Sequence, residues 1–308
     1  MTLQQMEYIV AVYRLRHFAK AAEQCGVTQP TLSAMIQKLE SELDVKLFER
    51  SSKAVVATPI GKLVVEQAWR VLTRAKKIKD IVAEAKGETG GSCRIGILPT
   101  IAPYLLPLFF NSMSKDYPEI DFHVTEMKTA DCKKSLNRGE IDIAILVSLD
   151  DMDDYEQTPL YYEQFMAYVS RQDPLFTRQS IKTSDLTDEF LWLLDEGHCF
   201  RDQLVKFCSL KSAQKSQNTY NLGSIETFMR MVESGRGVTF IPELSLGQLA
   251  PSQRELVRPF ALPIPTRQVV ALTTRSFVRH GQLRIVVDAI RNSVPERMLK
   301  MNNTEQRV

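Results

Sequence analysis

Residues 59–86 carry the strongest structural pattern in this sequence, because their apolar side chains recur with the spacing of one long helix. Thr58 suits the N-cap of that helix and Pro59 its first position. The apolar residues step by four and three over three heptads, at Val64, Ala68, Val71, Ala75, Ile78, Val82 and Ala85. Such a narrow stripe favours another helix as its partner, and packing within its own domain is the alternative. Residues 87–92, rich in Gly, Ser and Thr, predict a hinge after the helix.

The long helix separates two parts of unlike charge. The chain has 308 residues, which is long for one hydrophobic core and favours two domains. Residues 1–90 hold 14 Lys and Arg against 10 Asp and Glu, a net charge of +4, whereas the remainder holds 25 against 27, a net charge of −2. The basic N-terminal part suggests a nucleic-acid partner, although a solvated surface produces such a bias about as often.

The sequence predicts a cytoplasmic protein without a membrane partner. Its first fifteen residues lack the basic start of an export signal, and Glu7 and Arg14 interrupt their apolar pattern. The longest apolar run, residues 98–110, contains three prolines and is too short to cross a bilayer. Cytoplasmic thiols are kept reduced, so a disulfide there is transient or redox-sensing. The odd number of cysteines, five, also argues against a structural disulfide framework.

Residues 1–57 are dense in helical periodicity and include two short helices joined by a glycine-containing turn. The second helix is expected over residues 29–44, with Thr28 as its N-cap and Pro30 in its first turn. Its inward-facing residues are expected to be Leu32, Met35, Ile36, Leu39 and Leu43. Two helices joined in this way form a helix-turn-helix, and a turn within residues 48–55 predicts a β-wing after it.

The outer face of the second helix carries polar and basic side chains of the kinds that contact base edges and phosphates. The wing adds basic side chains that can follow the DNA backbone. The predicted contacts to double-stranded DNA are Thr28, Gln29, Pro30, Thr31, Ser33, Gln37, Lys38, Arg50 and Lys53. The periodicity alone fits a helix pair that only packs about equally well.

The order of the residues favours the DNA-binding interpretation. The runs HFAKAA (residues 17–22), VTQPTLS (27–33), IQKLE (36–40) and LFER (47–50) closely resemble the winged helix-turn-helix of LysR-type transcriptional regulators. The likeness covers nearly all of the first 60 residues.

This resemblance implies a DNA-binding domain at residues 1–58, and a linker and dimerisation helix with its hinge at residues 59–90. In the family the linker helix pairs two subunits, so we expect a homodimer or homotetramer on promoter DNA, with RNA polymerase as a further partner. The chain departs from the family at Cys25 and Asp44, where Leu and Gly are usual. Neither position lies on the expected DNA face.

After Cys93 the periodicity changes to alternating strands and helices. Strands are expected at residues 94–98, 121–126, 141–147, 165–170, 191–194, 238–242 and 268–273, and helices at residues 105–116, 130–138, 225–233 and 283–292. This alternation predicts an α/β domain with mainly parallel sheets. The LysR resemblance implies a regulatory domain at residues 91–308 with two subdomains, about 91–164 with 268–300 and about 165–267, and a cleft between them as in solute-binding proteins. The tail from Pro295 is expected to be loose.

Two of the five cysteines, Cys199 and Cys208, stand in the segment GHCFRDQLVKFC at residues 197–208. The expected start of a helix, the adjacent His198 and the nearby Arg201 each favour the thiolate of Cys199. A thiolate attacks the O–O bond of a peroxide and becomes a sulfenic acid, which a second thiol converts to a disulfide. The candidate donors to the leaving hydroxide are Thr100, Thr129, His198 and Arg267. From the spacing alone, two unrelated thiols are the commoner outcome.

The spacing of the two cysteines limits such a reaction. If residues 199–208 are helical, nine steps of about 1.5 Å separate the cysteines by roughly 13 Å along the axis and place them on opposite faces. A disulfide requires Cα atoms within about 7 Å. The helix must therefore unwind locally before the bond forms, which makes the segment a two-state element.

This segment closely resembles the redox segment of the hydrogen-peroxide sensors within the LysR family, and residues 98–100 and 103–107 also fit their pattern. The resemblance implies that Cys199 is the peroxidatic residue and Cys208 the resolving one, in a regulator of oxidative-stress genes. It also implies a peroxide pocket formed by Thr100, Thr129, His198 and Arg267.

The same resemblance implies that Arg201 and Asp202 support the redox chemistry and that a thiol reductant such as glutaredoxin or thioredoxin resets it. Residues 211–221 depart from the family pattern. We expect no cofactor and no metal, because no Cys and His set has the spacing of zinc ligands. The remaining cysteines, expected to be structural, are Cys25, Cys93 and Cys132. The alternatives are a LysR-type regulator that senses a small metabolite in the cleft, and a thiol peroxidase.

Overall fold

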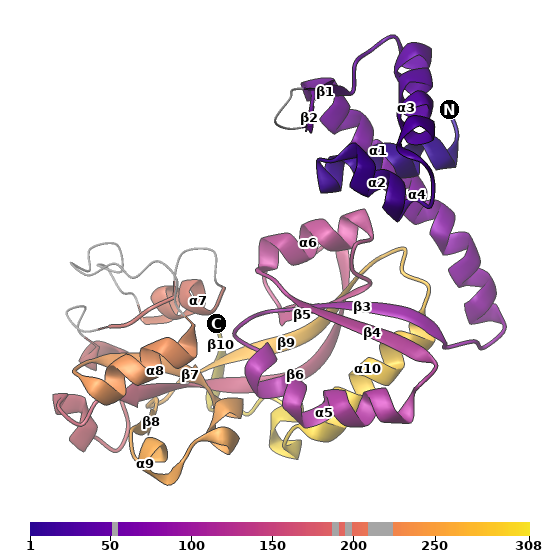
Figure 1. The fold of residues 1–308 in the computed structure, drawn as a ribbon. Helices are drawn as coiled ribbons and strands as arrows, with labels where there is room; N and C mark the ends of the chain where they lie inside the picture. The colour runs from indigo at the N-terminus through magenta and orange to yellow at the C-terminus, as the bar shows by residue number, and fades with distance from the viewer. Residues whose placement is uncertain (51–54, 187–190, 195–198, 209–223) are drawn as a thin grey trace. The chain divides into compact units, whose positions relative to one another are not determined.

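The computed structural model describes residues 1–50, 55–186, 191–194, 199–208 and 224–308 (Figure 1). They form two compact units, each with its own hydrophobic core. The first unit comprises residues 1–88 with 137–140, and the second comprises residues 89–136 with 141–308. The main boundary therefore falls within the predicted hinge.

The first unit is a helix-turn-helix followed by a hairpin and a long helix. Its elements are α1 (Leu3–Leu15), α2 (Phe18–Gln24), α3 (Gln29–Leu43), β1 (Phe48–Arg50), β2 (Val55–Ala57) and α4 (Pro59–Ala85). β1 and β2 pair antiparallel, which agrees with the predicted wing.

The start of α3 is set by Thr28, whose hydroxyl accepts a hydrogen bond from the backbone N–H of Thr31. The fully buried residues on its inner face are Leu32, Ile36 and Leu39. The prediction that Leu43 also faces inward is wrong, since its side chain is 36% exposed. Asp44 takes a left-handed conformation (φ 52°) and ends the helix there, so the last turn extends past the core.

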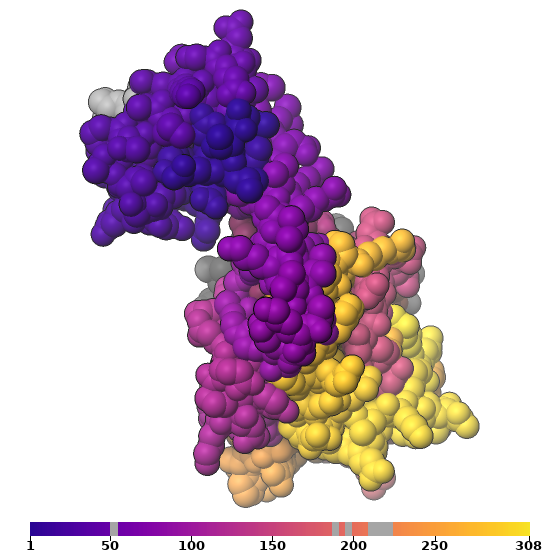
Figure 2. All heavy atoms as spheres, turned by 90° about the vertical axis from the view of Figure 1, so that its right-hand side faces the viewer, coloured from indigo at the N-terminus to yellow at the C-terminus, as the bar shows by residue number. Residues whose placement is uncertain are grey.

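The two halves of α4 have different surroundings. Near its start Val65, Ala68 and Trp69 pack into the core of the first unit, so the first part of the predicted seam is used within the domain. Further along, Ile78, Ile81 and Val82 are exposed, Ile78 by 66%. Figure 2 shows α4 (purple) at the surface.

The second unit is built on one sheet of eight strands. They are β3 (Gly91–Ile97), β4 (Ile120–Glu126), β5 (Ile143–Val147), β6 (Tyr155–Val169), β7 (Val238–Pro242), β8 (Val257–Pro259), β9 (Ile264–Thr274) and β10 (Glu305–Arg307). The main path runs β4-β3-β5-β9-β6-β7, with β10 beside β9 and β8 beside β6.

The sheet is mixed, so the prediction of mainly parallel sheets is wrong. β3 runs parallel to β4 and to β5, but β9 runs antiparallel to both β5 and β6. β7 and β8 also pair antiparallel with β6. The reason is that β6 and β9 are two long strands that run past each other in opposite directions and join the two halves of the sheet.

Most of β6 is missing from the sequence-based prediction, which places a strand only at residues 165–170. The strand begins ten residues earlier, at Tyr155, and its first part is polar and contains Pro159, where the pairing with β9 shifts register. β6 pairs with β9 as far as Gln164 and with β7 from Phe165 onward. This exchange of partners lies near the predicted crossing at residue 165, while the two-subdomain division stays a prediction.

Helices cover both sides of the sheet. They are α5 (Ala102–Asp116), α6 (Thr129–Arg138), α7 (Cys199–Cys208), α8 (Ile225–Ser234), α9 (Pro251–Arg254) and α10 (His280–Ser293). α5 and α10 contact each other, and α6 lies on the opposite side of the sheet from them (Figure 1). Among the described residues, no helix is long and apolar enough to cross a membrane.

Two further expectations are wrong. The tail after Pro295 is not loose, because Met298 is buried and β10 pairs with β9. Residues 191–194 do not form a full strand, since Leu191 makes a single bridge to Val238. In both places the apolar pattern is too short to reveal its partner, which lies far away in the sequence.

A buried carboxylate connects α3 to the wing. Glu40 is only 6% exposed, and its Oε1 accepts hydrogen bonds from the backbone N–H groups of Leu47 (2.8 Å) and Phe48 (3.3 Å). Its Oε2 pairs with the ammonium of Lys46 at 3.1 Å. One side chain therefore fixes the position of the wing relative to α3.

We predict that Glu40→Ala destabilises the first unit by about 2–3 kcal/mol, because it leaves two buried N–H groups without acceptors. Hydrogen exchange measured by mass spectrometry should show faster exchange at Leu47 and Phe48. Glu42→Ala, which removes an exposed carboxylate of the same helix, is the control and should leave this exchange unchanged. Equal protection in Glu40→Ala and the parent protein would contradict the assignment.

Candidate functional site

The helix α7 carries one cysteine at each end. It begins at Cys199 and ends at Cys208, and both side chains are buried, with 6% and 7% exposed. All five cysteines of the chain are free thiols in this structure. Because residues 199–208 are helical, the two sulfurs stand roughly 13 Å apart along the axis and cannot bond in this conformation.

Beside α7 lies a buried arginine that contacts several elements. Arg267, on β9, donates from Nε and Nη2 to Oε1 of Glu163 on β6, at 2.8 and 2.5 Å. Its Nη1 donates to the hydroxyl of Thr100 at 3.3 Å, and its Nη2 donates to the carbonyl of that residue at 3.0 Å. The guanidinium also lies 5.0 Å from the ring centroid of Phe200, the second residue of α7.

The environment of Cys199 contains opposing influences. Burial is the largest and raises the pKa of its thiol, whereas the charge of Arg267, the Thr129 hydroxyl and the backbone N–H of Phe200 lower it. The net effect is a raised pKa, so the expectation that the site favours the thiolate is wrong for this reduced form. Desolvation outweighs the helix start, one of the three features on which that expectation depended.

The positive charge near Cys199 does not come from the residue that the sequence suggests. Arg267 supplies it, while Arg201 lies 3.8 Å from the carboxylate of Asp202. The negative charge of Asp202 raises the pKa of Cys199, and the expected support of the redox chemistry by Arg201 and Asp202 stays a prediction. His198, the fourth candidate of the peroxide pocket, lies outside the described residues.

Thr129 is the first residue of α6 and contributes a buried hydroxyl to the site. The hydroxyl lies against the Cys199 sulfur and lowers the pKa of that thiol. It has no partner that meets full hydrogen-bond geometry among the described residues. A donor in that state is available to a small molecule bound beside the sulfur.

Two other buried thiols, Cys208 and Cys132, lack neighbours that lower their pKa. Burial alone raises the pKa of Cys208 to about 12. The pKa of Cys132 is raised to about 12, first by burial and then by Asp131 and Cys199. The environment thus singles out Cys199, which alone among these buried thiols has groups that offset desolvation.

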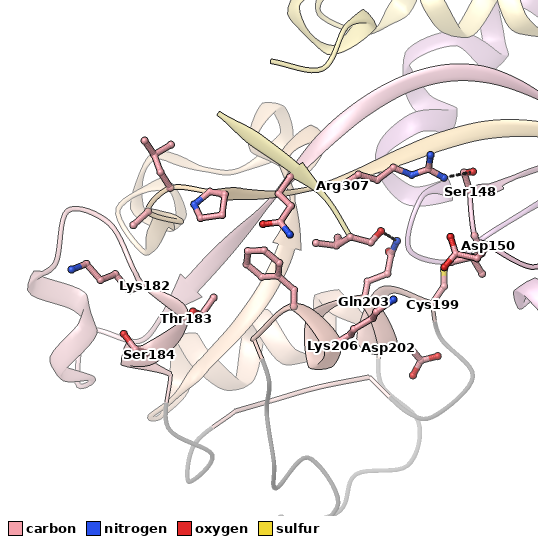
Figure 3. A pocket seen from close by; sticks show the side chains of 17 residues that line it. Ser148, Asp150, Lys182, Thr183, Ser184, Cys199, Asp202, Gln203, Lys206 and Arg307 are labelled. Carbon is pink, nitrogen blue, oxygen red and sulfur yellow. Dashed lines mark hydrogen bonds between the residues drawn. The ribbon is translucent and has the colours of Figure 1, made fainter. Parts of the chain in front are cut away.

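A cavity of about 930 Å³ reaches Cys199 from the side of β10. Figure 3 shows two hydrogen bonds on its wall: Gln203 donates to the carbonyl of Val308 at 2.6 Å, and Arg307 donates to the hydroxyl of Ser148 at 2.6 Å. The Oε1 of Gln203 is buried without a partner among the described residues. The C-terminal strand therefore helps to hold α7.

Sequence reasoning misses Glu163 and the role of Gln203 and Arg307. For Glu163 a usable signal exists, because it alternates with Tyr161 and Phe165 and thus shares the buried face of a strand. The contacts of Gln203 and Arg307 depend on the position of β10, which no local pattern reveals.

Comparisons with known proteins identify the family. The model for the bacterial regulatory helix-turn-helix protein of the lysR family matches residues 3–62. The model for the LysR substrate binding domain matches residues 86–295. The chain belongs to the LysR family of transcriptional regulators.

Individual LysR relatives are similar over nearly the whole chain. The chain is 33% identical over 302 residues to a hydrogen peroxide-inducible genes activator of Dickeya chrysanthemi, covering 98% of this chain and 99% of the relative. It is 34% identical over 270 residues to the DNA-binding transcriptional dual regulator OxyR of Escherichia coli, covering 87% and 88%.

Solved structures of LysR proteins agree with this fold. A full-length mutant OxyR from Pseudomonas aeruginosa matches with a TM-score of 0.79 and 35% identity, over 96% of this chain and 99% of that one. OxyR from Porphyromonas gingivalis matches with a TM-score of 0.66 and 47% identity, over 70% of this chain and 98% of that one. The predicted architecture of winged helix-turn-helix, long helix and α/β regulatory domain is confirmed.

The LysR helix-turn-helix exposes most of its predicted DNA face. The exposed candidates are Thr28, Gln29, Pro30, Thr31, Gln37 and Lys38. Ser33 is half-buried, and the side chain of Arg50 and the whole of Lys53 lie outside the described residues. Individual base and phosphate contacts stay predictions.

We predict that Thr129→Val slows alkylation of Cys199 severalfold near neutral pH. Loss of the hydroxyl removes one influence that lowers the pKa of the thiol, so the pKa rises and less thiolate is present at a given pH. Iodoacetamide labelling of Cys199, followed by peptide mass spectrometry over a pH series, should show the midpoint at higher pH. Thr125→Val, on the exposed face of β4, should match the parent protein. If the Thr129→Val profile also coincided with the parent profile, the Thr129 hydroxyl would have no role in lowering the pKa of Cys199.

Proposed function

We propose that this LysR-type regulator senses hydrogen peroxide through Cys199 and Cys208 and changes transcription of oxidative-stress genes in the cytoplasm. The observation that carries the proposal is the arrangement of α7, with a buried thiol at each end and polar donors beside only the first. The names of the relatives, hydrogen peroxide-inducible genes activators, support the same conclusion.

The chemistry begins at Cys199. Its thiolate attacks one oxygen of hydrogen peroxide, the O–O bond breaks, and the leaving hydroxide takes a proton to become water. Arg267, Thr100 and Thr129 are positioned to donate hydrogen bonds to the oxygens during this step. The product is a sulfenic acid on Cys199.

The second step joins the two ends of α7. The Cys208 thiolate attacks the sulfenic sulfur and displaces hydroxide, so two thiols and one peroxide give a disulfide and two waters. α7 must lose its helical form for the sulfurs to meet, which removes Phe200 and Leu204 from their buried sites. The disulfide contributes a few kcal/mol of constraint, enough to hold the new conformation.

The transcriptional response requires an assembly that can read promoter DNA. The exposed apolar residues on the second half of α4, Ile78, Ile81 and Val82, fit a homodimer contact, and a homotetramer follows if two dimers join. In this proposal oxidation alters the spacing of two helix-turn-helix units, with RNA polymerase as a further partner. A thiol reductant such as glutaredoxin or thioredoxin returns the pair to its reduced form.

A second candidate function is a LysR-type regulator that binds a small metabolite. The cavity of about 930 Å³ beside α7, with the unpartnered Gln203 Oε1 on its wall, favours this alternative. A metabolite sensor keeps its response when Cys199 and Cys208 are both replaced by Ser. A peroxide sensor loses it.

We predict that one equivalent of hydrogen peroxide consumes two thiols per chain and yields a linked Cys199–Cys208 peptide in nonreducing mass spectrometry. Cys208→Ser should stop at a sulfenic acid on Cys199, which dimedone captures. Cys199→Ser should give neither product and should keep the reduced DNA footprint. Cys93→Ser, in the core of β3, is the matched control and should respond like the parent protein. If Cys199→Ser still changed its footprint fully with peroxide, the proposal would fail.

We predict that Lys38→Ala weakens binding to a promoter duplex and to an unrelated duplex by the same factor, because an exposed lysine on α3 contacts phosphate rather than base. The slope of log affinity against log salt should fall by about one. Fluorescence anisotropy over a salt series measures both quantities. Lys115→Ala, an exposed lysine of α5, serves as control and should change neither. If the slope were unchanged in Lys38→Ala, Lys38 would not be one of the residues that contact DNA phosphates.

A further inference from the structure

We propose that Glu163 is the positioning residue of this site: it fixes the guanidinium of Arg267 between Thr100 and α7 and offsets part of its positive charge. The inference concerns the surroundings of the Cys199 thiol. It rests on the proposed function only for its biological meaning.

The position of Glu163 follows from the register of two strands. Glu163 on β6 and Arg267 on β9 are direct cross-strand partners, so their side chains project from the same face of the sheet. Both are almost completely buried, with 2% and 1% of their side chains exposed. Little solvent screens their attraction, and loss of either charge lowers the stability of the fold.

Both oxygens of the carboxylate are held. Oε1 accepts from Arg267 at 2.8 and 2.5 Å, and Oε2 accepts from the backbone N–H of Leu244 at 3.4 Å. Leu244 belongs to the 3-10 helix η4 (Glu243–Gln248). The strand β6 and η4 together therefore fix the orientation of the Glu163 carboxylate. The carboxylate in turn fixes the orientation of the Arg267 guanidinium.

The guanidinium has little freedom left. Nη1 and Nη2 also reach the hydroxyl and the carbonyl of Thr100, and the rings of Phe200 and Phe165 lie 5.0 and 5.8 Å from it. From this position Arg267 provides the strongest influence that favours the Cys199 thiolate. The carboxylate beside it bears the opposite charge, so Cys199 experiences a partly neutralised cation.

The other charged and titratable groups that face Cys199 are few among the described residues. Asp202, on α7 itself, disfavours the thiolate, and Cys132 on α6 is a further thiol in electrostatic range. Neither of them contacts Arg267 through a hydrogen bond in the structure. A change at Glu163 therefore acts on Cys199 through Arg267.

Two variants separate the charge of Glu163 from the presence of the ion pair. Glu163→Gln keeps an acceptor for Arg267 and removes the negative charge, so the thiolate gains from an unbalanced cation. Alkylation of Cys199 near neutral pH should then rise roughly threefold or more, with the midpoint at lower pH. Glu163→Gln combined with Arg267→Met removes both charges and should place the midpoint above that of the parent protein. This double change also avoids a lone buried charge, which protects folding.

The test measures iodoacetamide labelling of Cys199 over a pH series in the full-length reduced protein, without peroxide or DNA. Glu233→Gln is the control, because Glu233 on α8 is a carboxylate that pairs with Arg230 and contacts neither Arg267 nor η4 in the hydrogen bonds of the described residues. Its profile should match the parent profile. Opposite displacements of the single and double variants support the proposal; displacement in the same direction, or none, overturns it. Because no peroxide is used, the result stands apart from failure of peroxide sensing itself.

Discussion

The positive charge of a buried guanidinium requires a counter-charge and hydrogen-bond acceptors wherever it lies. Arg267 finds its partners in three separate parts of the regulatory unit. It meets Glu163 across the β6–β9 pairing, Thr100 in the turn after β3, and the first turn of α7 through Phe200. Each of these contacts comes from a different region of the sequence. The reactive end of α7 is therefore placed by the same interaction that joins the two long strands near the point where β6 changes partner.

In the proposed peroxide sensor, burial gives Cys199 both protection and selectivity. A thiol in an apolar site is mostly protonated and therefore slow with ordinary electrophiles. The same site concentrates donors around the sulfur, and their effect is large only for a molecule small enough to enter and polar enough to use them. Cys208 and Cys132 are also buried, and no neighbouring group offsets the rise that burial causes in their pKa.

Local chemistry explains what the sequence reveals and what it conceals. Thr28 and Thr58 each accept the hydrogen bond of a helix N-cap, and such caps are visible as short patterns. The helical form of residues 199–208 and the positions of Thr100 and Thr129 after β3 and β4 were also accessible from spacing. By contrast, the start of β6 is obscured by its polar residues and Pro159.

Long-range partners account for the other differences. The antiparallel pairing of β9 with β6 and the pairing of Glu163 with Arg267 join residues about a hundred positions apart or more. The return of β10 to β9 joins residues about forty positions apart. The pKa of Cys199 was misjudged for a related reason. A helix start and a neighbouring arginine are visible in the sequence, but the degree of burial that outweighs them is not.

The C-terminal strand has a practical consequence for work on this protein. Val308 accepts a hydrogen bond from Gln203 of α7, and Arg307 bonds to Ser148 at the end of β5. A few residues in and directly after β10 thus line the cavity and support α7. A substitution at Arg307 or Ser148 that breaks their hydrogen bond alters the molecule whose thiols are then titrated. Thiol measurements on such variants therefore report on a changed cavity wall as well as on the cysteines.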